Sequence, residues 1–266
     1  MNLTWRDSGK VGHAEPLVFL HAFPLDQSMW DPQFDFFSRS RRVITLDWPG
    51  LGQSSLSELA APGAGLEPYA QRLLRLLDHL EIERAGICGL SMGGYAALAL
   101  FRLAPDRVGS LILCDTRATA DPAEVKQGRY ETVERLGRLG VEAIEGLVKT
   151  MTPRLLGETT LTGSPYLVGK IEKMIRQNGP AGIARALTAL AERPDSSDLL
   201  AAIGNRENGR TLLVVGNEDM LTPPSEMELL SKAISGSTFV IIEGAGHLPN
   251  LEQSRLFNKA LGEFLT

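Results

Sequence analysis

The sequence has few cysteines and no long apolar run. Only two residues are cysteine, Cys88 and Cys114, and each ends a short apolar run that we interpret as a buried strand. This pattern predicts two small thiols in the core rather than a disulfide framework. No apolar stretch approaches the ~20 residues that a membrane span needs, and the N-terminal stretch MNLTWRDSGKVGHAE contains no apolar core of signal-peptide length. We therefore expect a cytoplasmic protein without a membrane partner.

An excess of positive charge is also absent. The chain carries 27 Lys and Arg against 32 Asp and Glu, a formal net charge of −5. This balance argues against nucleic acid, or an anionic membrane surface, as the main partner. The length of 266 residues, with 43% hydrophobic and 22% charged residues, is typical of one large globular domain or of one domain with an insertion.

Short apolar runs alternate with helical stretches along much of the chain. Six runs of four to six residues are rich in Val, Ile or Leu. Most of them lack clean polar alternation, as is typical of strands buried on both faces of a parallel sheet. The six runs cover residues 17–22, 42–46, 85–88, 110–114, 211–215 and 238–242. Helical stretches are expected over residues 67–80, 92–103, 223–234 and 251–265. This alternation predicts an α/β fold with a mostly parallel sheet.

Residues 116–209 break the alternation. They hold almost no strand-like run and show helical periodicity instead. We interpret them as a helical lid over the carboxyl ends of the strands, inserted into a core formed by residues 1–115 and 210–266. Three lid residues, Met151, Tyr166 and Met174, are predicted to contact substrate in a modest apolar cavity, which favours short acyl or alkyl groups.

The stretch Gly89-Leu90-Ser91-Met92-Gly93 has the pattern G-x-S-x-G where an apolar run gives way to an alanine-rich one. This pattern suits a sharp strand-to-helix turn that lifts one side chain off the top of a sheet. A serine hydroxyl in that place needs a base, a group that orients the base, and donors for an oxyanion. Ser91 is therefore the candidate nucleophile.

The candidate base is one of four histidines. His247 lies in EGAGHLPNLE, a glycine-containing loop between the last predicted strand and the last predicted helix, where it can reach Ser91. His13 and His79 are expected at the surface, and His21 lies in LHAFPLD at the end of a strand.

The candidate orienting acid is Asp219, which follows a predicted strand and precedes His247. The chain order serine, acid, histidine is the order found when such a triad is built on an α/β sheet. Asp115, which also ends a strand, and Glu218, which neighbours Asp219, remain alternatives.

Two backbone amides are the expected oxyanion donors. The amide of Met92 lies at the start of the helix that follows Ser91, where the helix dipole favours negative charge. The amide of Phe23 lies in the loop HAFPL after the first strong strand. Trp48, in the tight loop DWPGLGQS, is given mainly a structural role and is also a candidate for substrate contact.

Five motifs in order, HAFP, DWPGLGQS, GLSMGG, GNEDMLTPP and GAGHLPNLE, resemble those of the α/β-hydrolase superfamily. The resemblance implies an eight-stranded, mostly parallel sheet and a Ser91–His247–Asp219 triad. Within the superfamily the chain is most similar to carboxylesterases and 3-oxoadipate enol-lactonases. It departs from the pattern at Ala22, where the family's H-G-x-P has glycine, and in residues 3–11, which compress the first strands.

The expected function is cofactor-free hydrolysis of a small carboxylic ester through an acyl-serine. Serine in place of aspartate argues against a dehalogenase or an epoxide hydrolase, and no dinucleotide, phosphate-loop or metal-site pattern occurs. A lactonase, a carbon–carbon hydrolase, a perhydrolase and a non-catalytic ligand receptor are the alternatives. A lactonase would be favoured if a lid cation bound a substrate carboxylate. The lid cations considered are Arg117, Arg129, Arg154, Lys173, Arg176 and Arg185. The sequence does not indicate an oligomeric state.

Overall fold

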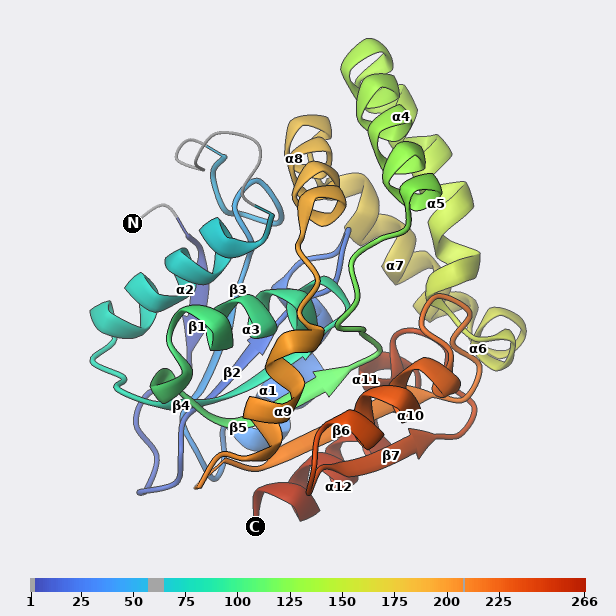
Figure 1. Ribbon diagram of the computed structural model, residues 1–266. Helices are drawn as coiled ribbons and strands as arrows, with labels where there is room; N and C mark the ends of the chain where they lie inside the picture. Colours follow the sequence, from blue (N-terminus) through green and yellow to red (C-terminus); the bar gives the residue numbers. More distant parts are fainter. Residues whose placement is uncertain (1–2, 57–64, 208) are drawn as a thin grey trace.

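Seven strands form one sheet in the order β1-β3-β2-β4-β5-β6-β7 (Figure 1). The computed structural model describes residues 3–56, 65–207 and 209–266. Only the β1–β3 pair is antiparallel. The strands are β1 (Trp5–Asp7), β2 (Leu17–Leu20), β3 (Val43–Leu46), β4 (Ala85–Leu90), β5 (Val108–Cys114), β6 (Thr211–Gly216) and β7 (Thr238–Ile242). The predicted α/β fold with a mostly parallel sheet is confirmed.

The described sheet has one strand fewer than the resemblance implied. Residues 3–11 contribute only the three-residue strand β1. The polar and glycine-rich residues that follow β1 offer little apolar surface for a second strand to bury. The antiparallel edge of the sheet is therefore short.

The central strands are buried because helices cover both faces of the sheet. All four residues of β2 have no solvent exposure, and every residue of β4 and β5 is buried. Helices α2 (Glu67–His79) and α3 (Met92–Leu103) pack together on one face, and α1 (Asp31–Phe37) packs with α12 (Ser254–Leu265) on the other. The two faces follow because the crossover from β2 to β3 and that from β3 to β4 run in opposite directions along the sheet, and parallel crossovers are right-handed. Cys88 and Cys114 lie buried on β4 and β5, as predicted.

Most predicted helix bounds agree with the structure to within a residue. The helix predicted over residues 92–103 is α3, and that predicted over 223–234 is α10 (Pro224–Ala233). The predicted last helix is instead two helices, α11 (Pro249–Glu252) and α12, because Gln253 between them has a φ of −129° and a ψ of 51°. Among the described residues, no helix is long and apolar enough to cross a membrane.

A helical insertion, residues 116–209, separates β5 from β6. Its helices are α4 (Ala123–Leu139), α5 (Val141–Leu155), α6 (Glu158–Gly163), α7 (Pro165–Gln177), α8 (Pro180–Glu192) and α9 (Leu200–Gly204). Figure 1 shows α4, α5, α7 and α8 grouped together away from the helices that flank the sheet. The division into a core and a lid stays a prediction, and its ranges include residues 1–2, 57–64 and 208, which lie outside the described part.

One carboxylate joins the segment before α4 to the segment after α8. Asp121, just before α4, accepts a hydrogen bond from Arg129 Nε at 2.7 Å and forms an ion pair of 2.8 Å with Nη1 of Arg193, just after α8. The two guanidinium groups hold the pKa of Asp121 below its usual range although burial opposes this. The neighbouring charges therefore keep this buried carboxylate ionised.

Candidate active site

Ser91 occupies a strained turn between β4 and α3. Its φ of 54° and ψ of −113° lie in a region that residues other than glycine rarely adopt. The backbone around it is anchored, since Ser91 N donates to Cys114 O at 2.9 Å and Ser91 O accepts from Thr116 Oγ1 at 3.0 Å. The turn ends the strand and directs the serine side chain away from the sheet.

The two glycines of the G-x-S-x-G pattern are required by close packing. A Cβ on Gly89 would lie 2.2 Å from Gly93 O, and a Cβ on Gly93 would lie 2.1 Å from Leu20 O. Real Cβ atoms do not approach backbone oxygens so closely. Glycine at both positions therefore lets α3 start directly over β2 and β4, which fixes the position of Ser91.

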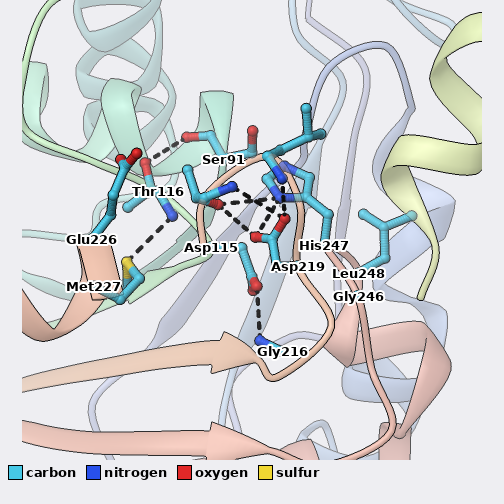
Figure 2. Close-up of polar contacts among 12 residues, drawn as sticks. Ser91, Asp115, Thr116, Gly216, Asp219, Glu226, Met227, Gly246, His247 and Leu248 are labelled. Atoms are coloured by element: carbon cyan, nitrogen blue, oxygen red, sulfur yellow. Dashed lines mark hydrogen bonds and ion pairs between the residues drawn. The ribbon is translucent and has the colours of Figure 1, made fainter. Parts of the chain in front are cut away.

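His247 and Asp219 form a buried pair beside this turn (Figure 2). His247 Nδ1 lies 2.8 Å from Asp219 Oδ2, and the side chains are 2% and 0% exposed. His247 follows β7 and Asp219 follows β6, so two neighbouring strands bring together residues that are 28 positions apart. This contact orients the imidazole and leaves its Nε2 for other partners.

Asp219 is held by further donors from its own loop. Its Oδ1 accepts from the backbone amides of Leu221 at 2.7 Å and Thr222 at 3.1 Å, and its Oδ2 accepts from Thr222 Oγ1 at 2.6 Å. Burial alone would raise the pKa of Asp219, but His247 and the Thr222 hydrogen bonds lower it below its ordinary value. The residue beside His247 is therefore an ionised, fixed carboxylate.

The two alternative acids have other partners. Asp115 is fully buried, with a φ of 45°, and its Oδ1 accepts from Gly216 N at 3.0 Å. Its Oδ2 has no hydrogen-bond partner among the described residues. Burial, and then the neighbouring Asp219, raise the pKa of Asp115 well above its usual range. Glu218 instead bonds the backbone amide of Thr159 in the insertion at 2.9 Å.

Within the described part of the chain, Asp115, Asp219 and His247 also make up one group of three possible metal ligands, with ligand atoms within 4.8 Å of one another. Metal ligands of this kind need free lone pairs and a deprotonated carboxylate. Both Asp219 oxygens already accept hydrogen bonds, and the raised pKa of Asp115 favours its protonated form. These three residues therefore fit a hydrogen-bonded arrangement, in which Asp219 binds His247, better than a metal site.

Ser91 and His247 line the same cavity, which has a volume of about 600 Å³. Its wall comes partly from the core, including Phe23 and Tyr95, and partly from helices α4, α5 and α8 of the insertion. A cavity of this size is in the range of small-molecule sites. The structure thus brings the candidate nucleophile and the candidate base to one concave surface, with Asp219 behind the base.

Of the two expected oxyanion donors, Phe23 belongs to the cavity lining, and Met92 directly follows the cavity-lining Ser91. Met92 is the first residue of α3, whose first-turn amides have no partner within the helix. His21 fixes the Phe23 loop, because its Nδ1 bonds Ala22 O at 2.9 Å and its Nε2 accepts from Trp48 N at 2.9 Å. Burial lowers the pKa of His21, in keeping with a neutral ring that can accept at Nε2.

Three of the four residues predicted to contact substrate do not line this cavity as the structure describes it, and only Met151 does. Trp48 is fully buried and donates its indole N–H to His21 O at 3.1 Å, so it stabilises the loop. Tyr166 lies on α7 with 84% of its surface exposed, and Met174, on the same helix, is buried in the core. Helical periodicity alone did not show which side of α7 faces the cavity.

The sequence-based prediction missed much of the polar lining. Asp121 and Tyr95 line the cavity beside Arg117, Arg129 and Arg154. The sequence does indicate Tyr95, because it lies about one helical turn after Ser91. In the structure its amide donates to Ser91 O at 3.1 Å.

The lid cations differ in their partners. Arg117 forms an ion pair with Glu226 at 3.0 Å, and Arg129 pairs with Asp121. Arg176 pairs with Glu145 and Glu172 outside the cavity. Arg154 lines the cavity, is exposed, and has no ion-pair partner in the described part of the chain. Of the lid cations named above, Arg154 is therefore the best placed to bind a charged ligand group.

Comparisons with known proteins agree with the observed fold. The profile of the alpha/beta hydrolase fold family matches residues 15–254. An esterase structure from Thermogutta terrifontis, with malate bound, is 40% identical with a TM-score of 0.90, covering 99% of this chain and 92% of that one. An enol-lactonase structure from Burkholderia xenovorans is 28% identical with a TM-score of 0.86, covering 99% and 96%. The 3-oxoadipate enol-lactonase 2 of Acinetobacter baylyi is 29% identical over 245 residues, 92% of this chain and 86% of its own length.

Proposed function

Because the chain belongs to the α/β-hydrolase fold family and is a hydrolase, we propose that it cleaves a small carboxylic ester with Ser91 as nucleophile. The observation that carries the proposal is the His247 Nδ1–Asp219 Oδ2 contact of 2.8 Å, made by a histidine that shares a cavity with Ser91. A base held by a buried carboxylate beside a serine on a strained turn is the arrangement that nucleophilic acyl transfer requires.

The proposed reaction has two halves. His247 Nε2 takes the proton from Ser91 Oγ while the oxygen attacks the carbonyl carbon, and Asp219 holds the Nδ1–H so that the imidazolium is stabilised. The Met92 and Phe23 amides donate to the oxyanion. Collapse of the intermediate expels the alkoxide, which takes the proton from His247 and leaves an acyl-serine. Water, deprotonated by His247, then attacks the acyl-serine, and the carboxylic acid and free Ser91 result.

The test compares wild type with Ser91→Ala on neutral p-nitrophenyl esters of several acyl lengths. If the triad acts as a unit, the variant loses turnover by about 10⁶-fold. Labelling of the wild type by a fluorophosphonate, and its absence in Ser91→Ala, gives a second readout. A variant that keeps most of its esterase activity would remove Ser91 from the mechanism.

A second candidate function is hydrolysis of an anionic lactone, as in a 3-oxoadipate enol-lactonase. Arg154 supports it, because an exposed cation that faces the cavity without an ion-pair partner in the described structure can bind a substrate carboxylate. The two candidates use the same triad and differ in whether the ester is cyclic and whether the substrate is charged. The ratio of kcat/KM for an anionic enol-lactone to that for a neutral ester separates them.

A further inference from the structure

Glu252 lies at the end of α11 and bonds both residues that flank His247. Its Oε1 accepts from Gly246 N at 2.9 Å and from Leu248 N at 3.1 Å. These amides belong to the residues directly before and after the candidate base (Figure 2). One carboxylate oxygen thus fixes the backbone on either side of His247.

The other oxygen of the same carboxylate bonds the insertion. Glu252 Oε2 accepts from Gly157 N at 2.8 Å, in the segment between α5 and α6. Burial raises the pKa of Glu252, and the hydrogen bonds that it accepts lower it again in part. A carboxylate that is withdrawn from solvent is stabilised when several donors satisfy it. The half-buried Glu252 has donors from two segments, one of them 95 positions away in sequence.

The contact between these segments is too close for side chains. A Cβ on Gly246 would lie 2.3 Å from Gly157 N, and a Cβ on Gly157 would lie 2.8 Å from Gly246 N. The backbone of the insertion at Gly157 is therefore in direct contact with the backbone of the His247 loop at Gly246. A shift of the insertion at Gly157 would be passed to His247 through this contact and through Glu252.

We propose that Glu252 is a positioning residue for the hydrolysis. Its carboxylate fixes the backbone of the His247 loop relative to the insertion, and so keeps the imidazole in place beside Asp219. Glu252 is not part of the cavity lining and acts only through His247. This inference rests on the proposed function of Ser91 and His247. It assigns to α11 a role beyond the capping of a four-residue helix by the Glu252–Leu248 contact.

The chain offers a matched control on the acid side of the site. Glu218 adjoins Asp219 and binds Thr159 N at 2.9 Å, so it also ties α6 to a catalytic loop. Its carboxylate makes no hydrogen bond to either neighbour of His247 that the described structure shows. Glu218→Gln therefore weakens only the bond to Thr159, while Glu252 still holds Gly157 and the amides on both sides of the base.

The experiment compares wild type, Ser91→Ala, Glu252→Gln and Glu218→Gln on a neutral p-nitrophenyl ester, with kcat, KM, fluorophosphonate labelling rate and Tm measured for each. The amide side chain of Glu252→Gln has a single carbonyl oxygen, which cannot accept from both segments at once. We therefore expect kcat and the labelling rate to fall by about 100-fold with KM nearly unchanged. Glu218→Gln should keep kcat near that of the wild type at a similar Tm.

The outcomes separate the two proposals. If Ser91→Ala is as active as the wild type, the proposed function fails. If Ser91→Ala is inactive while Glu252→Gln keeps the wild-type kcat, or Glu218→Gln loses as much kcat as Glu252→Gln, only the role of Glu252 is overturned. Should Glu252→Gln fail to fold, amide exchange in the wild type decides: Gly246 and Leu248 N–H should be protected, and exchange at the rate of an open loop would contradict the proposal.

Discussion

Asp115 and Asp219 lie with carboxylate oxygens within 4.8 Å of each other in the buried interior, yet only Asp219 bonds the histidine. Two carboxylates so close cannot both ionise without a large cost. The raised pKa of Asp115 and the lowered pKa of Asp219 show how the site resolves this conflict. We expect a proton to stay on Asp115 while Asp219 carries the charge that His247 needs.

This difference predicts unequal effects of two isosteric substitutions. Asp219→Asn removes the acceptor of the His247 Nδ1–H and should lower kcat by about 10⁴-fold. Asp115→Asn replaces a protonated carboxyl with an amide that can still accept from Gly216 N, so kcat should stay within a few-fold of the wild type. Steady-state kinetics on one ester would measure both, and equal losses would show that Asp115 shares the role of the acid.

Much of the site could be predicted because short motifs determine it. The G-x-S-x-G turn, the order of Ser91, Asp219 and His247, and the strand ends that carry them are local features, and Asp219 is the acid that the structure places beside His247. The lining of the cavity is not local. It depends on how α4, α5 and α8 pack over the core. In the same way, a period of 3.6 residues does not reveal which face of α7 is turned outward, so the sequence does not predict that Tyr166 is exposed.

Acidification should destabilise the fold through His21. Its pKa in the folded protein is lowered from 6.5, so the unfolded chain takes up a proton first and stability is lost as the pH falls below about 6.5. His21→Asn removes this titration but loses packing and hydrogen bonds, at a cost of about 1–3 kcal/mol at neutral pH. The Tm difference between wild type and variant should therefore shrink toward about pH 5. Parallel Tm curves would contradict the assignment.

Two glycines should respond in opposite ways to alanine. Gly93→Ala places a Cβ 2.1 Å from Leu20 O beneath the nucleophile turn and should cost about 3 kcal/mol or more. Gly137→Ala, in the exposed interior of α4 with no atom within 4 Å of the added Cβ, should gain about 1 kcal/mol from helix propensity. Urea unfolding measures both, and a stable Gly93→Ala protein would mean that α3 can move off β2.

Arg154→Gln should discriminate between charged and neutral substrates. A hydrogen bond to a charged group is worth about 1.5–3 kcal/mol, so KM for an anionic lactone should rise about 10- to 100-fold. KM for a neutral ester should stay within about two-fold, since no charge is lost to it. Lys149→Gln, on the exposed side of α5 outside the cavity lining, is the matched control. Equal effects on both substrates would rule out a carboxylate contact at Arg154.

The ion pair between Asp121 and Arg193 has a consequence for how such proteins diverge. Because Asp121 lies just before α4 and Arg193 just after α8, their ion pair of 2.8 Å holds the two flanks of these helices together. The stretch between positions 121 and 193 can therefore be exchanged for one of another length without disturbing strand register. We expect chimaeras joined at positions 121 and 193 to tolerate foreign helices, and to inherit the substrate range of the donor along with them.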